Sequence, residues 1–100
     1  MEITFGTTKL RRAYENHADA TRAWGEKIGR RYLQRVNEIY AAENARALGQ
    51  IPAARLHPLK AGRRGEYAVN LDETWRLIMV FTDDARTQVT LKEVSNHYGD

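Results

Sequence analysis

Residues 56–81 read LHPLKAGRRGEYAVNLDETWRLIMVF and contain the clearest structural pattern in the chain. Tyr67–Leu71 and Thr74–Phe81 are both rich in aromatic and β-branched residues, which favour strands. Asp72 and Glu73 lie between them and form a polar pair that suits a tight connection. The stretch therefore predicts a β-hairpin with a Gly- and Arg-rich loop at its mouth.

Arg76 interrupts the second of these runs, which is otherwise apolar from Trp75 onward. A cation within such a strand is costly unless it is paired or faces a site. The residues alone leave two interpretations open for Arg76. It either forms a structural ion pair with Glu66, Asp72 or Glu93, or it takes part in catalysis.

The loop before the hairpin is strongly basic. Residues 55–64 include Arg55, Lys60, Arg63 and Arg64 and contain no acidic residue. A cluster of this kind favours a polyanion, and binding through phosphates would be salt-dependent. The alternative is a solvated surface loop, and composition alone does not decide between the two.

Composition limits the remaining possibilities. One hundred residues fit a single domain over residues 1–100, and 42% hydrophobic with 29% charged residues is ordinary for a globular protein. Because there is no cysteine, disulfides and thiolate chemistry are excluded. His17, His57 and His97 lie far apart and show no metal-binding spacing, so we expect neither a metal nor a cofactor. No signal region or long apolar run is visible, so we expect a cytoplasmic protein without membrane contact.

The rest of the chain predicts an α+β fold in the order β-α-α-β-β-β, with a helical hairpin packed on one face of a small, antiparallel-rich sheet. The other face is expected to be available to a ligand. Hydrophobic spacing predicts a first strand at Met1–Phe5 and a last strand at Gln88–Val94. Between them it predicts a helix at about residues 8–21, capped by Thr7 or Thr8, and a second helix across Ile28–Tyr40, with a break at Trp24–Gly25. A further helical turn is predicted at Asn44–Leu48.

Several polar residues outside the loop are expected to be structural or solvated. His17 lies on the less polar stripe of the first predicted helix and is interpreted as a packed or partly exposed residue. The second predicted helix carries four cations that fall mostly outside its apolar stripe, namely Lys27, Arg30, Arg31 and Arg35. We expect these cations to be solvated, although together they form a basic face that could contact a partner.

The pattern L-H-P-L-K-x-G-R-x-G-x-Y-x-V, followed by a turn and W-R-L-I-x-x-F, resembles the HigB-type toxins of bacterial type II toxin–antitoxin modules, within the RelE/ParE superfamily. The matching positions are Leu56, His57, Pro58, Leu59, Lys60, Gly62, Arg63, Gly65, Trp75, Arg76, Leu77 and Ile78. The resemblance covers nearly the whole chain and implies a RelE-like fold. It also implies a ribosome-dependent mRNA endonuclease and a cognate antitoxin, often a helix-turn-helix protein, through which the complex would bind operator DNA.

Metal-independent RNA cleavage needs a base for the ribose 2′-OH, cations for the charge that develops on phosphorus, and an acid for the departing 5′-oxygen. His57 is the best acid/base candidate because its ordinary pKa suits proton transfer near neutrality. Its alternative is a loop histidine that hydrogen-bonds to the backbone. The resemblance assigns Lys60 and Arg63 to phosphate binding and Arg76 to catalysis. Arg55 and Arg64 complete the expected phosphate-binding set.

The C-terminus departs from the family pattern. Many HigB-type toxins end the last strand with Asp-Tyr-His, whereas this chain has Asn96, His97 and Tyr98. Neighbouring side chains of a strand point to opposite faces, so the exchange could move the imidazole out of the site. Either His97 or Tyr98 is therefore a candidate to complete the catalytic set.

Two other functions remain open on the sequence. The first is a non-catalytic toxin like the ParE-type members of the superfamily, which poison DNA gyrase. His57, Arg76 and the C-terminal pair His97–Tyr98 argue against it, since an inhibitor would not need titratable groups beside cations. The second is a plain nucleic-acid-binding domain that uses the basic loop only for docking.

Overall fold

The computed structural model describes residues 1–60 and 62–96 of the chain. The elements are β1 (Glu2–Phe5), α1 (Thr8–Glu15), α2 (His17–Trp24), α3 (Glu26–Ala41), α4 (Ala45–Leu48), β2 (His57–Pro58), β3 (Glu66–Asn70), β4 (Arg76–Phe81) and β5 (Gln88–Ser95). Within the described residues, no helix combines the length and apolar character needed to cross a membrane.

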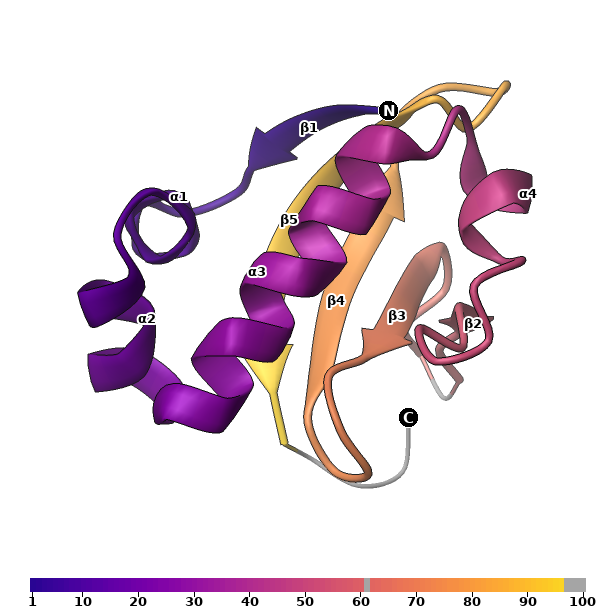
Figure 1. Cartoon of the computed structure of the whole chain (residues 1–100). Coiled ribbons are helices and arrows are strands. Elements are labelled where there is room, and N and C mark those ends of the chain that lie inside the picture. Colours follow the sequence, from indigo (N-terminus) through magenta and orange to yellow (C-terminus); the bar gives the residue numbers. More distant parts are fainter. Residues whose placement is uncertain (61, 97–100) are drawn as a thin grey trace.

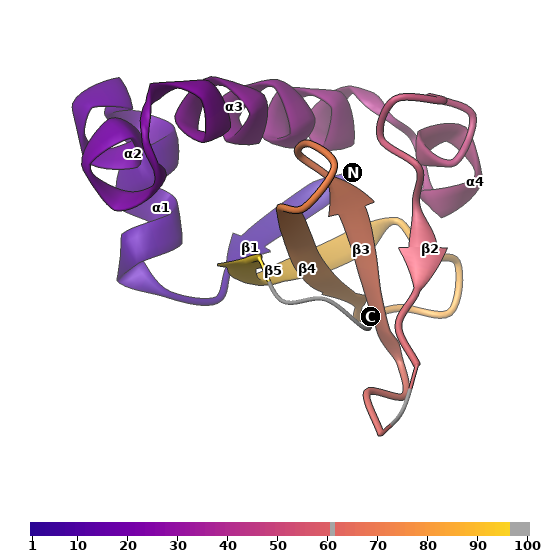
Figure 2. The same ribbon diagram turned by 90° about the horizontal axis from the view of Figure 1, so that it is seen from below.

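The five strands form one mixed sheet in the order β1-β5-β4-β3-β2 (Figure 1). The pair β1 and β5 is parallel, and the other three pairs are antiparallel. Figure 2 shows α1, α2 and α3 on the same side of the sheet, with α3 running along it. The predicted α+β fold, with helices on one face of an antiparallel-rich sheet, is confirmed.

The first predicted helix is wrong in one respect, because it is two helices. Asn16 has extended backbone angles (φ −140°, ψ 112°), and its N–H donates to the Arg12 carbonyl at the end of α1. Its side-chain oxygen then accepts from the Ala18 N–H at 2.9 Å and caps α2. The carboxamide replaces the hydrogen bonds that a continuous helix would have made, so the chain turns at this residue.

The main core lies between α3 and the face of the sheet that the helices cover. The largest fully buried side chains in it include Tyr32, Val36, Ile39, Leu77, Met79 and Leu91. The Tyr32 hydroxyl donates to the Leu10 carbonyl at 2.7 Å, and burial raises the pKa of this hydroxyl. Trp75 packs half-buried against this core. Alternate residues of β3, β4 and β5 therefore face the helices, and the residues between them face the other way.

Arg35 is buried, although the helical pattern placed it with the solvated cations; its exposed fraction is 2%. Its guanidinium donates to the carbonyl of Asn70 at 2.8 Å, the carbonyl of Ala53 at 3.1 Å and the carboxylate of Glu38 at 3.0 Å. The apolar stripe of α3 is wide enough to bring this position over the end of β3, where main-chain oxygens need donors. Arg35 thus links α3 to β3 and to the segment that leads into β2.

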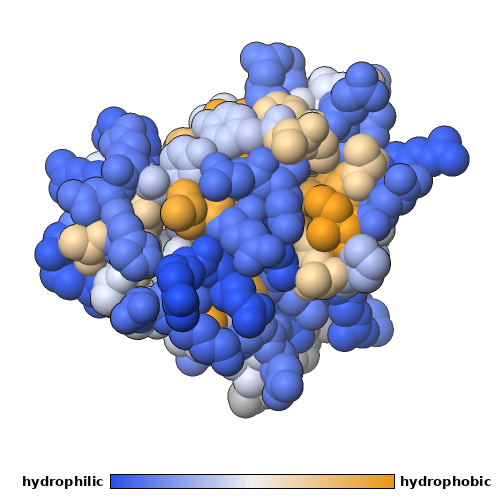
Figure 3. All heavy atoms as spheres, in the orientation of Figure 1, coloured by the Kyte–Doolittle hydropathy of each residue, from blue (hydrophilic) through white to orange (hydrophobic). Residues whose placement is uncertain are grey.

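The other three cations of α3 are exposed, as predicted. Figure 3 shows hydrophilic side chains over the outer face of α3, interrupted by small apolar patches. Arg30 lies 4.0 Å from Glu26, an exposed pair that contributes little to stability.

Candidate functional site on the helix-free face

The strand register places the main candidate residues on one face of the sheet, the face without helices. His57, Ala68, Ile78 and Glu93 form one row across β2, β3, β4 and β5. Arg76 lies one row further along β4, on the same face. From ordinary strand spacings, the backbones of His57 and Arg76 are about 12 Å apart. Two of the sequence candidates therefore share a face and approach from different strands.

His57 is oriented by the main chain. Its Nδ1 lies 2.8 Å from the Arg55 carbonyl oxygen, and because a carbonyl only accepts, Nδ1 carries the proton. In the neutral ring, Nε2 is then the basic nitrogen. Arg55 has a positive φ of 47°, which is uncommon for a residue with a side chain. The backbone contact expected in the structural interpretation is present, and it also selects a tautomer suited to accepting a proton at Nε2.

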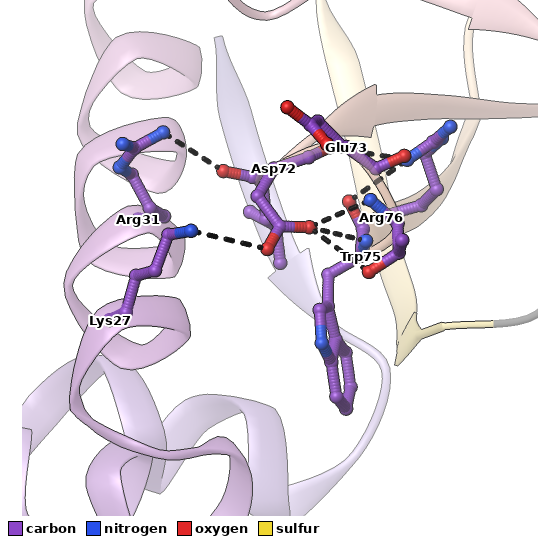
Figure 4. A network of polar contacts seen from close by, with 8 residues as sticks. Lys27, Arg31, Asp72, Glu73, Trp75 and Arg76 are labelled. Atoms are coloured by element: carbon purple, nitrogen blue, oxygen red, sulfur yellow. Dashed lines mark hydrogen bonds and ion pairs between the residues drawn. The ribbon is translucent and has the colours of Figure 1, made fainter.

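Arg76 contacts the β3–β4 turn (Figure 4). Among the described residues, its Nη1 donates to the carbonyl oxygens of Asp72 at 3.3 Å, Glu73 at 3.2 Å and Trp75 at 3.3 Å. These partners are main-chain oxygens and not the carboxylates considered from the sequence. These contacts hold the guanidinium beside the turn at the start of β4.

The Asp72 carboxylate stabilises the same turn. It accepts from the N–H groups of Thr74 at 2.8 Å and Trp75 at 2.7 Å, and it lies 3.7 Å from the Lys27 ammonium (Figure 4). Burial acts to raise the pKa of Asp72, but the hydrogen bonds from Trp75 and Thr74, together with Lys27, outweigh it and hold this pKa below its usual value. The turn that positions Arg76 is thus fixed by an ionised carboxylate.

Arg63 makes the ion pairs that had been considered for Arg76. Its Nε donates to Glu66 at 2.6 Å, and its Nη2 donates to Glu93 at 3.1 Å. Hydrogen bonding to Glu93, with a further contribution from Glu66, raises the pKa of Arg63. We call this group of Arg63, Glu66 and Glu93 the carboxylate clamp. Its formal charge is −1, so Arg63 is not presented to solvent as an uncompensated cation.

The β2–β3 loop covers part of the face that was expected to be open. Leu59 packs against Ala68 and Ile78 in a small core separate from the main one. Gly62 and Gly65 in this loop have φ values of 85° and 83°, which a glycine adopts without strain. Leu59 therefore covers the part of this face formed by Ala68 and Ile78.

The remaining candidates differ in what the structure says of them. Arg55, Lys60 and Arg64 are exposed along the loop and its approach. His97 and Tyr98 lie outside the described residues. No group of three or more His, Asp or Glu side chains within residues 1–60 and 62–96 could hold a metal ion.

Sequence reasoning did not identify Glu66 and Glu93 as partners of Arg63. A signal for Glu93 exists in the spacing of the apolar residues of the last strand. Val89 and Leu91 are two residues apart, whereas Leu91 and Val94 are three apart. One extra residue in an alternating pattern indicates a β-bulge, and the register of β4 and β5 contains one at this place.

A pocket lies between α3 and the β3–β4 turn. It has a volume of about 420 Å³ and is lined by Lys27, Arg31, Arg35 and residues 70–74 together with Ala53. Arg31 donates to the Leu71 carbonyl at 3.2 Å. None of the lining residues is a histidine, so this pocket has no group that titrates near neutrality, and it is a weaker candidate for acid–base chemistry.

Comparison with known proteins gives matches by structure. No family model and no curated protein matches the sequence. Three solved structures align with 98% of this chain. The YoeB/ParE toxin from Agrobacterium tumefaciens is 14% identical, with a TM-score of 0.57 and 100% of that chain covered. The YoeB–YefM complex and the YoeB dimer from Staphylococcus aureus are each 18% identical, with TM-scores of 0.55 and 0.56 and 98% of those chains covered.

Identities of 14% and 18% establish the fold and not the activity. The chain therefore has the fold of YoeB/ParE toxins, in agreement with the RelE-like fold implied by the sequence motif. The HigB subtype suggested by that motif stays a prediction, because the structural matches bear names of other toxins.

Proposed function

We propose that this chain is the toxin of a type II toxin–antitoxin module, a metal-independent endonuclease that cuts mRNA on the ribosome in the cytoplasm. The observation that carries the proposal is the shared helix-free face of His57 and Arg76, next to a basic loop, in a fold found in YoeB/ParE toxins. The HigB-like motif supports the same function through the residues it matches.

The chemistry follows from the two side chains. His57 Nε2 takes the proton of the ribose 2′-OH, and the resulting oxygen attacks the adjacent phosphorus. Arg76 stabilises the negative charge that develops on the phosphate oxygens. The P–O5′ bond breaks, the departing 5′-oxygen takes a proton, and the products are a 2′,3′-cyclic phosphate and a 5′-OH. His97 and Tyr98 are the candidate donors of that proton.

The proposed partners are an antitoxin, the ribosome and mRNA. One structural neighbour is a complex of YoeB with YefM, which supports a protein partner for this chain. The motif resemblance adds that the antitoxin is a helix-turn-helix protein. The toxin would then reach operator DNA only through it.

The proposal is tested by mapping the 5′ ends of messages after a short induction of the chain, with and without translation. Discrete cuts that require translation are expected. His57→Gln should reduce cleavage by roughly 10²–10⁴-fold, the usual contribution of acid–base catalysis. His17→Gln is the matched control, because His17 is exposed on α2.

Arg76→Ala should also abolish the cuts, and its control is Arg30→Ala, since Arg30 is exposed on α3. Intact messages in cells that nevertheless stop growing would refute the nuclease. That result would favour the second candidate function, a toxin that poisons DNA gyrase. This candidate is retained because one similar structure is a YoeB/ParE toxin. A gyrase supercoiling assay with the purified chain would then decide.

A further inference from the structure

The bulge in β5 brings a carboxylate onto the candidate site. Ile78 pairs with Glu93 and Met79 pairs with Leu91, so Lys92 is the extra residue. With regular alternation Glu93 would follow Leu91 onto the face that the helices cover. The bulge turns Glu93 to the helix-free face, into the row of His57. Bulges often redirect a side chain beside an active site.

The redirected Glu93 holds Arg63 from across the sheet. Arg63 belongs to the β2–β3 loop, whereas Glu93 belongs to β5, which is separated from β3 by β4. Glu66 holds the same guanidinium from the start of β3. The side chains are 37%, 25% and 49% exposed for Arg63, Glu66 and Glu93, so a phosphate can approach the group from solvent.

The clamp has an electrostatic consequence for nucleic acid. An arginine binds phosphate well because its fork donates two parallel hydrogen bonds. In the clamp, two of its N–H groups are already donated, and two carboxylates repel an incoming phosphate. A phosphate therefore gains the full attraction of Arg63 only if the guanidinium leaves one or both carboxylates. Leu59, packed on Ala68 and Ile78, keeps the base of the loop in place during such an exchange.

We propose that Glu66 and Glu93 are specificity-determining residues of this site, which make phosphate binding by Arg63 conditional on an exchange from carboxylate to phosphate. This inference rests on the proposed function and deepens it. Free single-stranded RNA does not gain enough binding free energy to offset the loss of the carboxylate contacts of Arg63, so it binds weakly. RNA that is held in the correct position displaces the carboxylates and engages Arg63.

The test is the affinity of the purified full chain for a short fluorescent single-stranded RNA, measured at several salt concentrations. Glu93→Gln should tighten binding about three- to tenfold, a range reduced by solvent screening at a half-exposed site. Glu93→Gln changes the formal charge of the clamp from −1 to 0, which should also steepen the plot of log affinity against log salt by about 0.7, the slope for one phosphate contact. Glu66→Gln should act in the same direction and provides a second measurement if Glu93→Gln is poorly folded.

Two controls separate this effect from net charge. Glu43→Gln removes the same charge from an exposed position between α3 and α4, and it should change affinity much less. Adding Arg63→Gln to Glu93→Gln should remove the gain. The inference is overturned if Glu93→Gln binds no more tightly than Glu43→Gln, or if the gain survives without Arg63.

The binding assay contains no ribosome and needs no cleavage, so the two proposals fail separately. A gain in Glu93→Gln without any mRNA cutting by the native chain would support the clamp and reject the nuclease. Cutting by the native chain without a gain in Glu93→Gln would support the nuclease and reject the clamp.

Discussion

Replacing Arg35 with methionine should cost about 3 kcal/mol of unfolding free energy, the lower end of the cost of breaking a buried charged network. The side chain is 2% exposed, and its guanidinium supplies hydrogen bonds to two carbonyl oxygens and one carboxylate. The substitution leaves the carbonyls of Asn70 and Ala53 without this donor, at about 1–3 kcal/mol for each buried group. The total cost in unfolding free energy is reduced by two effects. Glu38 is partly exposed and can be rehydrated, and the methionine side chain recovers some of the packing.

The measurement is urea unfolding followed by tryptophan fluorescence and circular dichroism. A loss of about 3 kcal/mol corresponds to a fall in Tm of roughly 12–24 °C for a domain of this size. Arg31→Met is the matched control, since Arg31 is exposed on the same helix and donates only one described hydrogen bond, to Leu71, and it should cost less than about 1 kcal/mol. If Arg35→Met costs no more than this control, the network is not a major stabilising interaction and the reasoning is refuted.

Three further substitutions test other features. Asn16→Ala should lower stability by about 1 kcal/mol in thermal unfolding, because α2 loses its N-cap; no change would contradict the capping role. Gly6→Ala should cost about 1–3 kcal/mol by the same method, since a Cβ would collide with the Leu91 carbonyl oxygen and push β1 away from β5; native stability would show that β1 can shift freely. The pKa of Asp72 is lower in the folded chain, so its stabilising effect is complete above the unfolded-state pKa of about 3.9 and is lost as the pH falls toward the folded-state value. Asp72→Asn should therefore flatten the acid side of a plot of urea midpoint against pH, and an unchanged acid side would reject this assignment.

The hairpin and most of the order of elements were predictable because their signals are local, whereas the two-residue strand β2 was not predicted. The aromatic and β-branched residues that predicted strands at Tyr67–Leu71 and Thr74–Phe81 formed β3 at Glu66–Asn70 and β4 at Arg76–Phe81. Asp72, predicted to lie in the connection, accepts the hydrogen bonds that close it. The preference for a strand is set by the residue types within a short segment, and one sequence contains that information.

Features that depend on distant partners were missed. The position of Arg35 on α3 is polar by sequence, and its burial makes sense only once the carbonyls of Asn70 and Ala53 lie beside it. The break at Asn16 arises because a carboxamide competes with helical hydrogen bonds, an effect that hydrophobic spacing does not report. A tertiary contact decided the case of Arg35, and a local side-chain hydrogen bond decided the case of Asn16.

The candidate site was predictable only in part, because some of its features have a local signal and others depend on the strand register. The motif selected His57 and Arg76, and the register places both on the helix-free face. The partner of Arg63 depended on the bulge in β5, which decides the face on which Glu93 lies. A shift of one residue in an alternating strand changes the face of every residue after it.

The parallel pairing of β1 with β5 has a consequence for the time at which the protein can fold during synthesis. Chains emerge from the ribosome with the N-terminus first, yet β1 has β5 as its neighbour in the sheet, and β5 ends at Ser95. The first strand therefore waits, unpaired, until nearly all of the described chain has been made. The five-stranded sheet that contains both His57 and Arg76 is therefore complete only after β5 has been synthesised.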